Sequence, residues 1–323
     1  MTNFKVRERC PACGTAKTIE RVRLAYDDDP LRTYLKTFYG PQGGVEFEYL
    51  RDVMYILQEC PECGLFYQRN IPNDALMWRL YEVWIDPQIA FNQRPERSRR
   101  VNQHYISELM LVDDYFNRSP SDIEILDFGM GWGDWAAMAN GLGFICHGLE
   151  LSQSRIDYAT KRGVNVLNWN QARQKRFDFI NTEQVFEHIA DPLDTLSNLK
   201  KLLKPGGIIK ISVPTATNIE KSLSAMDWGA GRNSPISLNP VAPLEHIQYF
   251  HRRTLQIMAS RVGMREFTWP MLSYWRSSCG SLSPFHLVKG VFKPIVYRLR
   301  RKQNYILLVC DANDVTPHPQ HPN

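Results

Sequence analysis

The chain has 323 residues, which is enough for one large domain with a smaller one, or for two domains. Its apolar share of 43%, charged share of 23% and formal charge of +5 argue against a disordered chain or a dedicated nucleic-acid binder. No apolar run is long enough to cross a membrane, and the residues after Met1 lack the layout of a secretory signal, so we expect a cytoplasmic protein.

A duplicated cysteine pattern comes first in the chain: CPACG carries Cys10 and Cys13, and CPECG carries Cys60 and Cys63. Paired C-x-x-C turns in a reducing compartment seldom form structural disulfides, and four thiolates make the tetrahedral set that zinc prefers. The pattern predicts one structural zinc ion in a zinc-ribbon-like module over residues 1–72. Redox-active or merely buried cysteines are the alternative. DDDP and GPQGG between the two turns indicate an inserted loop.

Residues 73–120 are predicted to form a helical bridge. PNDALMWRLYEVWIDP has apolar residues at helical spacing after an Asn-Asp start, and an amphipathic helix follows the stretch RPERSRR. The arginines of that stretch form either a solvated face or a phosphate-binding patch; they are Arg94, Arg97, Arg99 and Arg100.

Strand-like and helix-like segments alternate from Ile123 onward, beginning with IEILDFG and DWAAMANGLG and continuing to IIKISVP. Such alternation predicts a parallel sheet with helices on both faces, in which ligands bind beyond the carboxyl ends of the strands. We expect this second domain to have its own core, separate from the zinc module.

The stretch ILDFGMGWGDW lies at the first of those strand ends and contains Gly129, Gly131 and Gly133. Glycines there permit positive backbone dihedrals and let a ligand approach the main chain. Glu150 follows about 20 residues later, near the end of the next strand, where its carboxylate can accept both hydroxyls of a ribose. An adenosine-type ligand is therefore expected, either a dinucleotide or S-adenosylmethionine.

The in-register pattern D-x-G-x-G-x-G, which starts at Asp127, resembles motif I of class I S-adenosylmethionine-dependent methyltransferases. FDFINTEQVFEHIADP and LKKLLKPGGIIKISVP are similar to later blocks of the same family, and the resemblance covers residues 121–260. It implies an α/β fold with a Rossmann-like, seven-stranded methyltransferase sheet over residues 121–313. It also implies S-adenosylmethionine as cofactor, bound by Asp127, Gly129, Gly131, Gly133, Glu150 and Leu151.

A zinc module in front of such a domain is similar to the methyltransferases of sugars and related metabolites in antibiotic and surface-polysaccharide pathways. PLEHIQYF, residues 243–250, resembles their Y-x-E-H-x-x-Y-F stretch, which implies that Glu245 and His246 lie at the catalytic centre. Pro243 stands where that pattern has tyrosine, so the phenol is either absent or supplied elsewhere. The chain also ends before the extra C-terminal domain of the sugar C-methyltransferases. O-methylation of a sugar or another metabolite is therefore at least as well supported as C-methylation.

Histidine is suited to removing the acceptor proton, and a neighbouring carboxylate can fix its tautomer. We therefore expect His246 to be the general base, oriented by Glu245 or another carboxylate; an ordinary loop histidine is the alternative. His188 is expected to open the helix after the fourth strand in a structural role. The segment 215–242 is either a substrate-covering insert or an ordinary surface loop.

The expected partner is a small-molecule acceptor, such as a sugar or nucleotide sugar. NTEQ after the fourth strand differs from the motifs that hold planar nitrogen acceptors, so amine and base methylation are disfavoured. Two alternatives stay open: a nucleic-acid methyltransferase that grips phosphates with its zinc module and arginines, and a non-catalytic scaffold. The basic stretch FKPIVYRLRRK either packs or touches a membrane surface, and residues 314–323 are predicted to be disordered.

Overall fold

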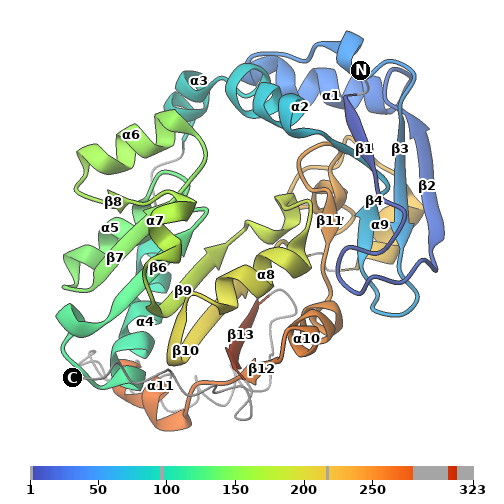
Figure 1. Cartoon of the computed structure of the whole chain (residues 1–323). Coiled ribbons are helices and arrows are strands. Elements are labelled where there is room, and N and C mark those ends of the chain that lie inside the picture. Colours follow the sequence, from blue (N-terminus) through green and yellow to red (C-terminus); the bar gives the residue numbers. More distant parts are fainter. Residues whose placement is uncertain (1–2, 95–97, 216–217, 279–304, 311–323) are drawn as a thin grey trace.

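The computed structural model describes residues 3–94, 98–215, 218–278 and 305–310. Figure 1 shows two bodies: an N-terminal unit and a larger domain built on a sheet. Helices of the bridge connect them on one side, and the short strand β11 lies against the N-terminal unit on the other. The basic stretch 292–302 and the tail 314–323 lie outside the described residues, and the domain boundaries stay predictions.

The N-terminal unit contains a four-stranded sheet in the order β11-β4-β3-β2 and a separate pair of strands, β1 and β5. Its strands pair antiparallel. The inserted stretch between the cysteine turns forms a helix and two short 3₁₀ turns rather than a bare loop. The elements are β1 (Phe4–Val6), β2 (Ile19–Ala25), α1 (Leu31–Tyr39), Gly40–Gln42, Phe47–Tyr49, β3 (Met54–Glu59), β4 (Phe66–Gln68) and β5 (Asn70–Pro72).

The bridge consists of α2 (Asp74–Arg79), a π-helical turn (Leu80–Trp84), α3 (Pro87–Asn92), α4 (Arg99–Phe116) and a 3₁₀ turn (Pro120–Asp122). Each α-helix starts at a polar cap: the side chain of Asn73, Asp86 or Ser98 accepts a hydrogen bond from a backbone N–H of the first turn. These caps explain why the helices begin where they do.

The larger domain contains a seven-stranded sheet in the order β12-β13-β10-β9-β6-β7-β8. β9 pairs parallel with β10 and β6, and β7 pairs parallel with β6 and β8, whereas β13 runs antiparallel to β10 and β12. The expected seven-stranded α/β fold is thereby confirmed. The strands are β6 (Glu124–Phe128), β7 (Ile145–Leu149), β8 (Asn165–Val166), β9 (Phe177–Glu183), β10 (Leu203–Ser212), β12 (Met264–Phe267) and β13 (Tyr305–Cys310).

Helices cover both faces of this sheet (Figure 1). Side chains alternate along a strand, so Ile125 packs with residues of α4, α5 and α6, while Leu126 packs on the other face with residues of α7, α8 and α10. The helices are α5 (Asp134–Gly141), α6 (Gln153–Lys161), α7 (Trp169–Arg173), α8 (Pro192–Lys200), α10 (Arg252–Arg261) and α11 (Met271–Ser278).

A buried ion-pair cluster fixes α4 to the sheet. The ammonium of Lys210 in β10 lies 2.7 Å from Glu108 of α4 and 2.6 Å from Glu183 at the end of β9. Burial disfavours the charged form of Lys210, but the two carboxylates outweigh this and raise its pKa. The bridge is therefore tied to the strand end beside the expected ligand site.

The segment 218–242 contains α9 (Ile219–Ala225) and a 3₁₀ turn (Asn239–Val241), and it packs on the N-terminal unit. The indole of Trp228 lies 5.3 Å from the ring of Tyr34 and 5.8 Å from that of Tyr55. This packing supplies part of the core of the N-terminal unit. Whether the segment also covers a substrate stays a prediction.

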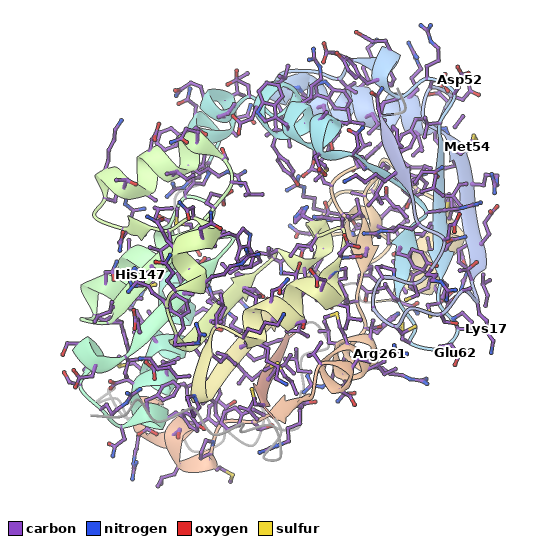
Figure 2. All side chains as sticks on the ribbon, in the orientation of Figure 1. Lys17, Asp52, Met54, Glu62, His147 and Arg261 are labelled. Carbon is purple, nitrogen blue, oxygen red and sulfur yellow. The ribbon has the colours of Figure 1, made fainter. Side chains whose placement is uncertain are left out.

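The sheet domain and the bridge have a core of their own on the Ile125 face of the sheet, but the core on the other face is shared with the N-terminal unit. All four paired cysteines belong to the same buried cluster as Phe250, Leu255 and Met258 of the sheet domain. The hydroxyl of Thr254 in α10 donates a 2.8 Å hydrogen bond to the carbonyl of Cys63. Figure 2 labels Lys17 and Glu62 at the cysteine end of the N-terminal unit, with Arg261 of α10 nearby; Glu62 and Arg261 line one surface pocket.

The strand order of the large sheet reverses next to β6. β6 lies between β7 and β9, so the reversal falls at the carboxyl ends of β6 and β9, where open α/β sheets bind ligands.

Within the described residues, no helix combines the length and the apolar character needed to cross a membrane.

Candidate active site

The glycine loop follows β6, and its three glycines have positive φ values of 69° at Gly129, 56° at Gly131 and 71° at Gly133. A Cβ on Gly129 would lie 2.6 Å from Val185, and one on Gly133 would lie 2.8 Å from Ala159. Packing within the chain therefore explains these two glycines. A Cβ on Gly131 would meet no atom within 4 Å, so this glycine borders the open space that a ligand can enter.

Asp127 ends β6 in a buried position, and its Oδ1 accepts a 2.8 Å hydrogen bond from the amide of Asn181 in β9. Its other oxygen, Oδ2, is buried without a hydrogen-bond partner among the described residues. Burial raises the pKa of Asp127 to about 7, although the Asn181 bond acts in the opposite direction. A ligand that donates a hydrogen bond would satisfy Oδ2.

Glu150 follows β7 and turns its carboxylate toward the glycine loop. Its Oε2 accepts from the backbone N–H of Gly131 at 2.9 Å, and its Oε1 accepts from Leu151 at 2.8 Å and Ser152 at 3.1 Å. These bonds fix the carboxylate beside the open position at Gly131. Leu151 is 88% exposed, so its side chain is free to lie against a ligand.

The bridge packs over this loop. Phe91 of α3 lies 5.1 Å from the ring of Trp132 and 5.0 Å from that of Tyr158. The guanidinium of Arg94 forms a 2.8 Å ion pair with Asp134, the first residue of α5. Arg94 is thus used within the chain, which weakens the phosphate-patch alternative; Arg97 lies outside the described residues.

Two histidines from distant parts of the chain meet beside the end of β9. His188 belongs to a 3₁₀ turn (Phe186–His188) before α8, and His246 precedes β11 (Gln248–Tyr249). Their ring centroids are 5.0 Å apart. The expectation that His188 opens the helix is wrong, since α8 begins at Pro192.

Both imidazoles are held through Nδ1 by backbone carbonyl groups. Nδ1 of His246 lies 2.5 Å from the carbonyl oxygen of Asn239, and Nδ1 of His188 lies 2.9 Å from that of Glu245. A carbonyl only accepts, so each Nδ1 carries the proton and each Nε2 keeps a lone pair. The expected orientation of His246 by a carboxylate is wrong: a backbone carbonyl does this, and the Glu245 carboxyl bonds Tyr39 instead.

Burial sets the protonation of this cluster. Burial, with His246 adding to it, lowers the pKa of His188 to about 3, and burial also lowers the pKa of His246. Glu187 is fully buried with neither carboxyl oxygen hydrogen-bonded within the described chain, and burial raises its pKa to about 8. Glu187, His188 and His246 each present an oxygen or nitrogen within 4.8 Å of the others. They form a buried acid–base cluster whose histidines are neutral.

Phenols from the N-terminal half complete the cluster, although Pro243 replaces the expected tyrosine. The hydroxyl of Tyr39, at the end of α1, donates to Glu245 at 2.8 Å. The hydroxyl of Tyr81, in the π-helical turn, lies 3.0 Å from Nδ1 of His188. The sequence carries no motif around Tyr39 or Tyr81 that would have identified them.

The loop and the cluster are close enough to influence each other. Burial raises the pKa of Tyr81, and the charges of Glu245, Glu187 and Glu150 act in the same direction. The positive charge of Arg155, which lies 5.8 Å over the ring of Trp132, contributes to lowering the pKa of His188. Tyr81, which contacts His188, is therefore also near enough to Glu150 to feel its charge, and Arg155, which contacts Trp132, is near enough to His188 to do the same.

The four paired cysteines converge as expected. Sγ of Cys10 lies 3.6 Å from that of Cys63, and Sγ of Cys13 lies 3.4 Å from that of Cys60. None of the four forms a disulfide bond. All four sulfur atoms lie within 4.8 Å of one another. Zn–S bonds of about 2.3 Å in a tetrahedron would separate the sulfurs by about 3.8 Å, so this donor set fits zinc.

Comparison with known proteins gives one family match, in which residues 97–265 match the model described as "Methyltransferase domain". The ubiquinone biosynthesis O-methyltransferase of Coxiella burnetii is 28% identical over 152 residues, 44% of this chain and 63% of that protein. That of Rickettsia bellii is 34% identical over 131 residues, 38% of this chain and 53% of that protein. The chain thus spans between half and two thirds of the length of these relatives.

Among solved structures, the plantazolicin methyltransferase BpumL in complex with SAH matches with a TM-score of 0.46 and 14% identity, covering 73% of this chain and 94% of that one. The family match covers just over half of the chain and includes the glycine loop, Glu150 and both histidines. The chain therefore belongs to the methyltransferase-domain family, and this part of it is a class I S-adenosylmethionine-dependent methyltransferase domain.

Proposed function

We propose that the protein transfers a methyl group from S-adenosylmethionine to a hydroxyl group of a small molecule, with His246 as the general base. The observation that carries this proposal is the 2.5 Å contact between Nδ1 of His246 and the carbonyl oxygen of Asn239. Because a carbonyl only accepts, Nδ1 carries the proton and Nε2 has a lone pair to accept another. The relatives matched over the same domain are O-methyltransferases by name.

The residues around the glycine loop suit the cofactor. Gly131 borders open space, Glu150 has a fixed carboxylate for the ribose hydroxyls, and Asp127 has a buried oxygen that lacks a donor. Gly129 and Gly133 shape the loop, and Leu151 supplies an exposed apolar side chain. When bound, S-adenosylmethionine supplies a methyl group attached to a positively charged sulfur, and this sulfur is the leaving group in an in-line displacement by the acceptor oxygen.

His246 would take the acceptor proton on Nε2, while S-adenosylmethionine, held by the glycine loop and Glu150, would supply its methyl group to the acceptor oxygen and leave with the carbon–sulfur electron pair. The imidazolium formed is adjacent to Glu187, whose ionisation a positive neighbour would favour. Glu245 links the two histidines, since it directly precedes His246 in the chain and its carbonyl accepts a hydrogen bond from Nδ1 of His188. Its carboxyl group accepts a hydrogen bond from Tyr39. Much of the rate would come from holding acceptor and donor in line.

The finer acceptor class that we propose is a sugar or a related metabolite. It rests on the resemblance of the stretch 243–250 and of the four-cysteine unit to sugar methyltransferases. We also propose that the four cysteines bind one structural zinc, which has no open coordination position and takes no direct part in the chemistry.

The test is to incubate the protein with methyl-labelled S-adenosylmethionine and fractionated small-molecule extracts, and to identify the labelled product by mass spectrometry. We expect a methyl ether, made by the parent protein and strongly reduced in the His246→Gln variant. Label in RNA or DNA, or a product methylated at carbon or nitrogen, would contradict the proposal.

A further inference from the structure

The stretch 241–249, which carries Glu245 and His246, has an unusual backbone. Leu244 adopts a φ of 72°, a left-handed conformation that a non-glycine residue keeps only where its surroundings hold it. Next to it, the N–H of Glu245 bonds back to Pro243 and that of Ile247 bonds back to Glu245, which are tight local turns. The conformation of this stretch therefore depends on contacts from outside it.

Those contacts come from the N-terminal sheet. Gln68 of β4 is fully buried, and its side-chain amide donates to the carbonyls of Ala242 at 3.0 Å and His246 at 3.1 Å. Its backbone N–H donates to the carbonyl of Ile247 at 2.9 Å. The hydroxyl of Tyr55 in β3 donates to the carbonyl of Val241 at 2.8 Å. Four carbonyls of the stretch are thus bound by two N-terminal residues.

The same support extends to His188. β11 pairs with β4, which places Gln248 opposite Tyr67. The amide of Gln248 then donates to the carbonyls of Phe186 and Ile189, each at 2.7 Å, on either side of Glu187 and His188. Both histidines are therefore located by backbone segments that are fastened, directly or through β11, to β4.

We propose that the N-terminal four-cysteine unit is the template that positions the catalytic stretch 241–249, and that Gln68 is its principal positioning residue. The inference rests on the proposed role of His246. It assigns the unit a function in turnover rather than in cofactor binding, because the expected cofactor residues follow β6 and β7 of the other sheet.

The test uses the full chain with Gln68→Leu, which keeps a similar volume but removes the donor to both carbonyls. Calorimetry should show unchanged affinity for S-adenosylmethionine. Turnover on the acceptor found by methyl labelling should fall about 100-fold, the size expected when a base is displaced by about 1 Å. NMR of carbon-13-labelled histidine, with His246→Gln to assign the resonance, should show the His246 ring titrating at higher pH, because water reaches a ring whose pKa burial lowers.

Gln58→Leu is the matched control. Gln58 is also buried and lies in the neighbouring strand β3, but its side-chain amide donates to Thr18 at 3.3 Å, away from the stretch 241–249. This variant should keep parental turnover and the parental His246 titration. Tyr55→Phe removes only the hydroxyl that holds Val241, and it should cause a smaller loss of turnover in the same direction as Gln68→Leu.

Parental turnover and an unmoved His246 titration in Gln68→Leu would overturn the proposal. Equal loss of turnover in Gln58→Leu, or loss of cofactor affinity in both Gln68→Leu and Tyr55→Phe, would do the same, since either result indicates a general effect on folding. A moved titration in Gln68→Leu combined with an active His246→Gln variant would leave the template in place and reject His246 as the base.

Discussion

The ring of His188 lies edge-on to the ring of His246, with 5.0 Å between their centroids and 62° between their planes. Each ring donates its Nδ1–H to a backbone carbonyl, so both present a basic Nε2. Two positive charges this close would repel each other, so binding of a proton by one ring disfavours protonation of the other, and burial lowers the pKa of both rings.

His246→Gln should lower the methylation rate by about 10²–10⁴-fold, because glutamine keeps some hydrogen bonding but cannot accept the proton. Affinity for S-adenosylmethionine should stay nearly intact, since the glycine loop and Glu150 are unchanged. Single-turnover kinetics and calorimetry separate the two effects.

His188→Gln provides the comparison for this variant. Its ring is bonded to the Glu245 carbonyl and contacts the hydroxyl of Tyr81, so the substitution should have a smaller effect on rate. A nearly fully active His246→Gln variant together with an inactive His188→Gln variant would transfer the role of base to His188.

Glu150→Ala should weaken binding of S-adenosylmethionine by about 1.5–3 kcal/mol, which corresponds to about 10- to 150-fold in affinity. The substitution would remove the proposed charge-assisted bonds to the ribose and the acceptor that fixes the Gly131 N–H. Glu124→Ala, at the opposite end of β6, is the control and should leave the affinity unchanged. Unaltered affinity in Glu150→Ala, or preferential binding of a nicotinamide dinucleotide by the parent protein, would exclude the assignment.

Alanine substitutions at Gly131 and Gly133 should have different effects, one mainly on cofactor binding and the other mainly on stability. Gly131→Ala has space for its Cβ, so the substitution should lower the free energy of unfolding by only about 1–2 kcal/mol, the cost of a left-handed backbone at alanine. The added methyl group should obstruct binding of the cofactor. Gly133→Ala should destabilise the fold further, because its Cβ would lie 2.8 Å from Ala159. Urea unfolding and calorimetry should rank the two variants in opposite orders; the same order in both measurements would contradict this division.

The glycine loop and its position at the strand ends could be predicted from sequence because its parts are local. Alternating segments identify the strands, and Asp127, the glycines and Glu150 follow consecutive strands, so parallel packing brings them to one edge. The His246 environment is different. Its orienting partner is the backbone carbonyl of Asn239. Because every residue has a backbone carbonyl, the sequence gives no sign of which one orients the ring.

The relation between the two bodies of the molecule could not be predicted either. The pattern 243–250 indicated a catalytic stretch, and the cysteine turns indicated a separate module. Nothing in either pattern indicates that β11 joins β4 or that Tyr39 reaches Glu245. Such pairings depend on tertiary packing between segments that are remote in the chain.

Metal analysis should find one zinc per chain, and Cys63→Ser should release it. Because the cysteines share a core with α10 and Cys63 is bonded to Thr254, loss of the ion should also lower the melting temperature of the whole chain. Cys146→Ser, which changes a cysteine outside the two C-x-x-C turns, should retain the zinc. A zinc-free parent protein with a Cys10–Cys13 disulfide under reducing conditions would refute the site.

The stability of the chain should depend on pH through Glu187. Its pKa is about 8 in the folded chain against an ordinary 4.5, so the folded state holds a proton that the unfolded state releases. Stability from this group is fully present below about pH 4.5 and is lost as the pH rises toward 8. Glu187→Gln cannot ionise and mimics the protonated form. Its free energy of unfolding, measured in urea, should therefore rise relative to that of the parent between pH 5 and 8.

Glu46→Gln is the control for this measurement, because Arg79 lowers the pKa of Glu46 although burial acts in the opposite direction. The contribution of Glu46 is present above its ordinary pKa and is lost only as the pH falls through the lower folded value. Its difference from the parent should thus stay constant between pH 5 and 8. Asp127, whose pKa is also raised, titrates in all three proteins and cancels from the comparison. A Glu187→Gln difference that is equally flat would show that Glu187 is ionised in the folded protein, with a cation or donor beside it.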